Sequence, residues 1–162
     1  MKQLLEQYAA YNTWANKRIV ETASQLPEAQ INQEIVSSFP SVYKTVLHMM
    51  EVENAWWLRL KLVENPTVYG WFTGNFGELS KKLLEVSTQW MNWVQQTNEV
   101  NIMHVFAYQN SKKEHFKQPV YEMLLHLFNH QTFHRGQLVT MFRQLGMTKI
   151  PPTDFIVFTR KK

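Results

Sequence analysis

The sequence predicts an all-α protein, a four-helix bundle with a short β-hairpin between its third and fourth helices. Three observations support this prediction. Apolar residues recur at a period close to 3.6 residues in four long segments. The connections between these segments are mostly short, as in a bundle. The chain has 162 residues, the length of one domain. We therefore expect a single domain over residues 1–162, large enough to fold around an apolar core without a disulfide or metal.

The first two helices are placed by their apolar spacing and by proline. The first helix is expected over about Lys2–Ser24, because Pro27 follows it. The second helix is expected to begin near Pro40-Ser41, where proline suits a first helical turn. It continues to about Val63, ahead of Asn65-Pro66.

The other two helices enclose the predicted hairpin. The third helix is expected from Gly77-Glu78 to about Thr97, and the fourth from Pro119 to Leu145 with Gly146 as its C-cap. Between them, alternating side chains over Ile102–Phe116 and the polar turn Asn110-Ser111-Lys112-Lys113 indicate the hairpin. The tail over residues 151–158 is expected to be extended and to pack back on the bundle.

Composition limits the chemistry and the partners. The chain has no cysteine, which excludes a disulfide, a zinc ribbon, an iron–sulfur cluster and a cysteine nucleophile. The formal net charge is +4, but the basic residues are dispersed, apart from the terminal cluster Arg160-Lys161-Lys162. We interpret this cluster as a solvated tail and expect no nucleic-acid partner.

Hydropathy indicates the compartment. No apolar run approaches the roughly 18 residues that a membrane-spanning helix needs. The opening segment Met1–Tyr8 lacks the continuous apolar block of a signal peptide. We therefore expect a cytoplasmic protein with no membrane partner.

The fourth helix carries three histidines, His126, His130 and His134, at intervals of four residues. Residues at this spacing lie on one face of a helix, about 40° apart around its axis. The apolar stripe of the helix is interrupted at Gln131 and His134, so it is polar only at its middle. At roughly 100° per residue, His134 lies near the centre of this stripe, His130 faces inward beside it, and His126 lies at the flank.

A third inward histidine is predicted on the second helix. His48 lies among apolar residues and shares a helix face with Val52 and Ala55. Buried imidazoles without a partner are costly, so polar positions on two helices suggest one shared partner. Imidazole is the most common side-chain ligand of transition metals. We therefore predict a divalent-metal site formed by His48, His130 and His134; the alternative is that these are hydrogen-bonded core histidines.

Neighbouring residues are candidates for supporting roles. Glu51, three residues after His48, is a candidate acceptor for the free N–H of that ring, or a solvated carboxylate. His126 and Asn129 are candidates for orienting the ligands of the fourth helix, or are ordinary packing residues at its flank. Gly136 is expected at a close approach between helices, because glycine weakens a helix interior.

The chain resembles the DinB/YfiT-like family of metal-dependent four-helix bundles over nearly its whole length. The resemblance is carried by four segments in order: Tyr11-Asn12-Thr13-Trp14-Ala15-Asn16; Leu47-His48 with Glu51 and Trp56-Trp57; Asn129-His130-x-x-x-His134-Arg135-Gly136-Gln137; and Gly146 with Pro151-Pro152 and Asp154. It implies an up-down-down-up bundle, often a homodimer. It also implies a site for one zinc or nickel ion per chain, held by the same three histidines that helical geometry selects.

The resemblance and the ligand set together suggest the chemistry. Three neutral imidazoles leave a metal coordination position open, which is typical of catalytic zinc. Some relatives are thiol transferases or isomerases that use bacillithiol, mycothiol or glutathione. Our leading hypothesis is a metal-dependent transferase that joins a low-molecular-weight thiol to an electrophile. The alternatives are a metal-dependent hydrolase and a non-enzymatic metal-binding or stress-response protein.

Overall fold

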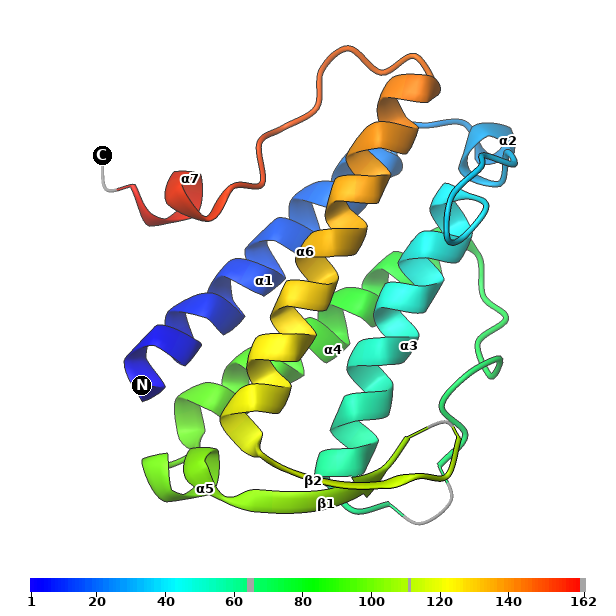
Figure 1. Cartoon of the computed structure of the whole chain (residues 1–162). Coiled ribbons are helices and arrows are strands. Elements are labelled where there is room, and N and C mark those ends of the chain that lie inside the picture. Colours follow the sequence, from blue (N-terminus) through cyan, green and yellow to red (C-terminus); the bar gives the residue numbers. More distant parts are fainter. Residues whose placement is uncertain (64–65, 111, 161–162) are drawn as a thin grey trace.

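A computed structural model describes residues 1–63, 66–110 and 112–160 of the chain (Figure 1). Four long helices form its body: α1 (Lys2–Ala23), α3 (Val42–Leu60), α4 (Phe76–Gln96) and α6 (Val120–Gln144). Each lies within a few residues of its prediction, which confirms the bundle. Predictions at Asn65, Ser111 and Lys161-Lys162 lie outside the described residues. Among the described helices, none is long and apolar enough to cross a membrane.

The bundle has the up-down-down-up topology. In Figure 1, α1 and α6 run upward while α3 and α4 run downward. The helices pack as a closed ring in which α1 contacts α4 and α6, and α3 contacts the same two helices. Because α3 and α4 run in the same direction, the chain must return along the bundle between them, and the described residues of this connection are 61–63 and 66–75 (Figure 1).

Local signals fix where the helices begin and end. The Ser41 side chain caps α3 by accepting a hydrogen bond from the Lys44 N–H at 3.1 Å. Helix α3, the second of the four predicted helices, therefore begins directly after the Pro40-Ser41 pair. At the other end of the bundle, Gly146 has a φ of +87° and lies just past α6. Its N–H donates to the Arg143 carbonyl, so glycine closes the helix as predicted.

The end of α3 differs from the prediction. The helix ends at Leu60 and not at Val63. Leu62 adopts the left-handed conformation, with a φ of 53°, and its N–H donates to the Arg59 carbonyl. This is the same type of closure that glycine provides after α6. The sequence gives little indication that α3 ends here, because leucine rarely adopts the left-handed conformation.

The hairpin is confirmed, but it begins later than predicted. Strand β1 (Val105–Gln109) pairs antiparallel with β2 (His115–Pro119). The residues before it form the short helix α5 (Glu99–Met103), in which Ile102 is fully buried. The Asn98 side chain caps α5 by accepting from the Asn101 N–H at 2.8 Å. This cap favours a helical turn where alternation alone predicted a strand.

Two further short helices, α2 (Glu28–Ile31) and α7 (Phe155–Thr159), were not predicted. The tail is therefore partly helical and not extended throughout. It does pack back on the bundle, as expected. The Tyr11 hydroxyl donates to the Thr153 carbonyl at 2.8 Å, and the ring of Phe155 lies 5.1 Å from that of Tyr11.

The core consists of two apolar clusters with polar residues between them. One cluster includes Leu5 of α1 and Leu127 of α6, and the other includes Ile19 of α1 and Leu138 of α6. Fully or almost fully buried polar side chains lie between these positions along all four helices. We call five of them the polar layer: Asn12, Asn16, Glu53, Ser87 and Arg135. The three predicted metal ligands lie at the same level on α3 and α6.

Candidate metal centre

The three predicted ligands meet between α3 and α6. The Nε2 atom of His48 lies 3.2 Å from that of His130. The Nε2 atom of His130 lies 3.1 Å from that of His134. One ligand atom from each residue lies within 4.8 Å of the other two. Helical spacing explains the convergence, because His130 and His134 are one turn apart on α6 and His48 approaches from the neighbouring helix.

These separations fit a divalent metal ion. Tetrahedral zinc with nitrogen ligands at 2.0–2.1 Å places two ligand nitrogens about 3.3 Å apart. The alternative of hydrogen-bonded core histidines fits less well. The Nε2 atom of His130 faces two other ring nitrogens, but a neutral imidazole nitrogen has only one hydrogen or one lone pair to offer. A cation between the three nitrogens satisfies all of them at once.

The surroundings keep the three imidazoles uncharged. Burial lowers the pKa of His48 to about 4, and repulsion from His134 adds to this effect. Burial lowers the pKa of His130 to about 3, with further lowering by its three histidine neighbours. Burial also lowers the pKa of His134. At neutral pH the ring nitrogens therefore offer lone pairs, which is the form that binds a metal.

One side chain outside the triad orients a candidate ligand. The Oε1 atom of Gln137 lies 2.8 Å from Nδ1 of His134. An N–H at Nδ1 donating to this oxygen leaves the lone pair on Nε2, toward the other histidines. The Nε2 atom of Gln137 in turn donates to the Ser38 hydroxyl at 3.0 Å. The position of Gln137 three residues after His134 on one helix makes this contact possible.

Two aromatic rings pack against the triad. The ring of Phe39, just before α3, stacks on His48 with 3.9 Å between ring centroids. Phe39 also lies 5.6 Å from the ring of His134, and Phe133 lies 5.1 Å from the same ring. The neighbourhood of the three nitrogens is thus apolar, and this desolvation is the main cause of the lowered pKa values.

The comparison with known proteins identifies the family. The family model described as the DinB family matches residues 1–161. The chain belongs to the DinB family. It is 28% identical over 156 residues to Protein DinB of Bacillus subtilis (strain 168), with 90% of this chain and 87% of that protein covered.

Two solved structures share the fold of this DinB-family chain. A DinB-like protein from Bacillus cereus ATCC 10987 aligns with a TM-score of 0.68 at 16% identity, covering 88% of this chain and 91% of that one. YfiT from Bacillus subtilis aligns with a TM-score of 0.67 at 13% identity, covering 91% of each chain. YfiT is described as a probable metal-dependent hydrolase with an unusual four-helix bundle topology.

In this DinB-family structure the predicted hydrogen bond from His48 to Glu51 is not formed. The Oε1 atom of Glu51 accepts a hydrogen bond from the Gly70 N–H at 2.6 Å. No hydrogen bond among the described residues joins Glu51 to His48. Gly70 belongs to the long connection between α3 and α4, so the carboxylate fastens that segment to α3. A side chain three residues after His48 can reach either partner, and the sequence does not reveal the position of the connection.

The flanking candidates on α6 contribute less than expected. His126 is exposed, and its ring lies 5.9 Å from that of His130. Asn129 is also exposed, and no hydrogen bond among the described residues uses its side chain. The expected close helix approach at Gly136 is wrong, because a Cβ atom there would meet nothing within 4 Å.

The polar layer is the feature that the sequence interpretation missed. Arg135 follows His134 directly but extends to the opposite side, where Nη1 donates to Oδ1 of Asn12 at 2.8 Å and of Asn16 at 2.7 Å. Both asparagine amides donate to Oε1 of Glu53, at 2.8 and 3.1 Å. The signal was available, since polar residues at these positions interrupt otherwise apolar helix faces.

Buried charge in this layer is compensated within the layer. Burial raises the pKa of Glu53 to about 7, while hydrogen bonds from Ser87, Asn12 and Asn16 and the charge of Arg135 oppose the rise. The Ser87 hydroxyl donates to Oε2 of Glu53 at 2.7 Å. In this DinB-family bundle the layer connects all four helices at the level of the metal centre.

Proposed function

We propose that this protein is a metal-dependent transferase that acts with a low-molecular-weight thiol. One divalent ion per chain, zinc or nickel, is held by His48, His130 and His134. The observation that carries the proposal is the convergence of three uncharged imidazoles on one point. An ion held only by neutral ligands keeps its full positive charge and lowers the pKa of a thiol or water that reaches it.

The residues around the triad suit sulfur. Phe39 and Phe133 give the histidines an apolar surface, which favours a soft, weakly hydrated ligand atom. Gln137 fixes the direction of the His134 lone pair. In the proposed reaction the thiol S–H bond breaks and its proton leaves to solvent. A sulfur lone pair then forms a bond to an electrophilic carbon, and the leaving group departs with its bonding electron pair.

We favour a thiol over water as the nucleophile because hydrolysis would also benefit from a base close to the metal. A bound ion can itself ionise water, and a base within hydrogen-bonding reach adds to this activation. Among the described residues, no carboxylate forms a hydrogen bond with any of the three histidines. Glu51 is the nearest along α3, and its Oε1 atom is engaged by Gly70. A thiol needs no such base, because it ionises far more readily than water.

The test combines metal content with thiol-dependent conjugation. The protein is purified without a tag and without added chelator, and its zinc and nickel are measured by mass spectrometry. Conjugation of glutathione to 1-chloro-2,4-dinitrobenzene is then followed by absorbance. We expect about one ion per chain and a rate that depends on the ion. His134→Ala should lose both.

The matched control is His104→Ala. His104 is an exposed histidine just before β1 and lies outside the triad, so its removal should leave metal content and rate unchanged. Equal rates for His134→Ala and wild type would contradict the proposal. A bound metal with no activity toward any thiol or ester would instead support a non-enzymatic metal-binding role.

Metal-dependent hydrolysis is the second candidate. It is supported by the structural likeness to YfiT, with its description as a probable metal-dependent hydrolase. Hydrolysis of p-nitrophenyl acetate without added thiol distinguishes the two reactions. A metal-dependent rate that thiol does not increase, and that His134→Ala abolishes, would favour the hydrolase.

A further inference from the structure

Gln131 is a fully buried polar residue that belongs neither to the triad nor to the polar layer. It interrupts the apolar stripe of α6, three residues before His134. Its Nε2 atom donates a hydrogen bond to the backbone carbonyl of Met49 on α3 at 2.9 Å. Met49 is also fully buried. The bond therefore joins two helices inside the bundle, where an amide is costly to bury.

This bond lies directly beside two of the candidate ligands. Gln131 follows His130 on α6, and the carbonyl that it contacts belongs to the residue after His48 on α3. His130 and His134 share one helix, so helical geometry alone fixes their spacing. The position of His48 relative to that pair depends instead on how α3 lies against α6. The bond from Gln131 acts on this one variable.

Other side-chain hydrogen bonds do little to hold α3 against α6. Apart from the contact between histidines, the described residues form one more such bond, from the Thr45 hydroxyl to the sulfur of Met141 at 3.7 Å. It is weak, because a thioether sulfur is a weak acceptor. The polar layer joins α3 to α1 and α4, and it joins α6 to α1. Gln131 therefore makes the direct connection between α3 and α6 beside the metal centre.

The bond contributes little to stability for the amide that it buries. The Met49 carbonyl lies inside α3, so it also accepts the helical bond from the N–H four residues later and needs no second donor. The Oε1 atom of Gln131 has no hydrogen-bond partner among residues 1–63, 66–110 and 112–160. A methionine of similar length would fill the same space without an amide to desolvate. Position explains Gln131 better than stability does.

We propose that Gln131 is a positioning residue, which holds His48 against the histidine pair of α6. The proposal rests on the metal site of the proposed function and not on its thiol chemistry. In the tautomer that binds a metal, the three Nε2 atoms all carry lone pairs, which repel one another and favour separation of α3 from α6. The bond from Gln131 to Met49 opposes this separation. It keeps the ligands within the roughly 0.5 Å that a binding site tolerates.

The first test compares metal affinity with stability in Gln131→Met. Zinc affinity of the full-length protein is measured by competition with a chromophoric chelator, and stability by urea denaturation of the metal-free protein. We expect zinc affinity to fall about tenfold, at the lower end of the range for residues that support metal ligands. The urea midpoint should equal or exceed that of wild type. Unchanged affinity, or a lower midpoint together with lower affinity, would overturn the proposal.

A cobalt spectrum identifies which ligand is displaced. The visible absorption of bound Co²⁺ depends on the number and arrangement of its ligands. Gln131→Met should shift this absorption toward that of His48→Ala, which retains only the pair on α6. A spectrum identical to that of wild type would show that His48 still reaches the ion, and the proposal would then be wrong.

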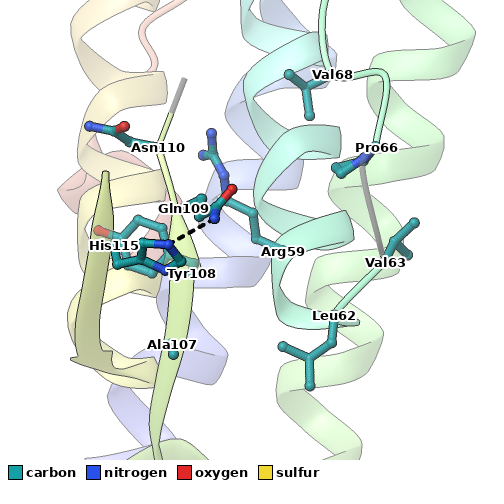
Figure 2. Close-up of a pocket in the computed structure, with 10 residues that line it drawn as sticks. All are labelled: Arg59, Leu62, Val63, Pro66, Val68, Ala107, Tyr108, Gln109, Asn110 and His115. Carbon is teal, nitrogen blue, oxygen red and sulfur yellow. Dashed lines mark hydrogen bonds between the residues drawn. The ribbon is translucent and has the colours of Figure 1, made fainter. Parts of the chain in front are cut away.

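Gln109→Met is the matched control. The Gln109 amide also joins two elements, because its Nε2 atom lies 3.0 Å from Nε2 of His115 on the opposite strand of the hairpin (Figure 2). Gln109 is exposed and lines a cavity whose lining includes none of the three histidines. The same substitution there should leave zinc affinity and the cobalt spectrum unchanged. Equal effects of the two substitutions would contradict a specific role of Gln131.

A readout without metal separates this proposal from the proposed function. Crystal structures of metal-free wild type and Gln131→Met give the distance between the Nε2 atoms of His48 and His130, which is 3.2 Å in this structure. We expect a longer distance in the variant. If wild type takes up no zinc, the metal-dependent function fails, but a longer distance in Gln131→Met would still support the positioning role. An unchanged distance would overturn it.

Discussion

The three histidines and the polar layer both include residues of α3 and α6, but they differ in their hydrogen-bond partners. The layer pairs most of its groups internally: the Glu53 carboxylate accepts three hydrogen bonds, and Arg135 donates to two asparagines, although its buried Nε atom has no partner among the described residues. The Nε2 atoms of the three histidines have no such partners within their own cluster. Their Nε2 atoms face each other at 3.1 and 3.2 Å with no described anion among them.

This difference indicates what each cluster is for. A buried polar network whose groups are satisfied fixes a single arrangement of its helices. A cluster of lone pairs directed at one point is completed only by a cation from outside. His134 and Arg135 are consecutive, so α6 carries a proposed metal ligand on one side and a residue that fixes its own position on the other. Stability should depend on the layer and metal affinity on the histidines.

The largest effect should follow the loss of Arg135. Arg135→Met removes the buried partner of two asparagines and leaves the Glu53 carboxyl without its nearby positive charge. Breaking a buried charge network by removing one member costs about 3–5 kcal/mol. The free energy of unfolding, measured by urea denaturation of the metal-free protein, should fall by this amount.

Two further variants define the origin of that loss. Arg143→Met removes an exposed arginine of the same helix and should change the stability by no more than about 0.5 kcal/mol. Adding Glu53→Gln to Arg135→Met should recover part of the loss, because the uncompensated carboxyl is gone. A small effect of Arg135→Met, comparable to that of Arg143→Met, would show that the layer does not hold the bundle together.

The next effect is the response of stability to zinc. A ligand that binds only the folded state stabilises it by about 2.7 kcal/mol at a concentration 100 times its Kd. Wild type should gain this stability when free zinc is buffered at that level. His130→Ala should gain almost none, although its metal-free stability should stay close to that of wild type. A large loss of metal-free stability in His130→Ala would mean that the histidines, like the layer, are structural.

The same contrast shows which features could be predicted from the sequence. Helical periodicity was sufficient for the four helices and for the inward positions of His48, His130 and His134, because both depend on local geometry. The polar layer was missed because its residues come from four separate helices, and the polar interruption on each helix does not show by itself which other interruptions it meets. Glu51 was misjudged because its partner, Gly70, belongs to a long connection that local rules do not place.

A smaller effect is expected from the residue that orients His134. Gln137→Leu removes the oxygen that accepts from Nδ1 of His134. Loss of such a partner typically lowers metal affinity about 10–100-fold. Zinc affinity, measured by competition with a chromophoric chelator, should fall by this factor, whereas Gln144→Leu at an exposed position of the same helix should have no effect. Equal affinities in the two variants would limit the metal centre to the histidines themselves.

The smallest effect should be a difference in how stability depends on pH. His48 and His130 have pKa values of about 4 and about 3 in the folded protein, below the ordinary 6.5. Below pH 6.5 the unfolded chain therefore binds protons that the folded protein does not, and the histidines reduce stability as the pH falls. Glu53 acts in the opposite direction. Its folded pKa of about 7 lies above the ordinary 4.5, so its contribution to stability is full below pH 4.5 and is lost as the pH rises to 7.

Single-cluster variants separate these two opposing slopes in metal-free protein. In Glu53→Gln the opposing contribution of Glu53 is gone, so stability should fall more steeply than in wild type between pH 6.5 and 5. With His48→Ala and His130→Ala combined, the slope contributed by Glu53 should remain, and stability should fall less steeply or rise over the same interval. Urea denaturation at several pH values measures both. Identical slopes in the three proteins would mean that neither cluster keeps its shifted protonation in the folded state, and the contrast between a self-compensated layer and an uncompensated ligand set would then rest on hydrogen-bond geometry alone.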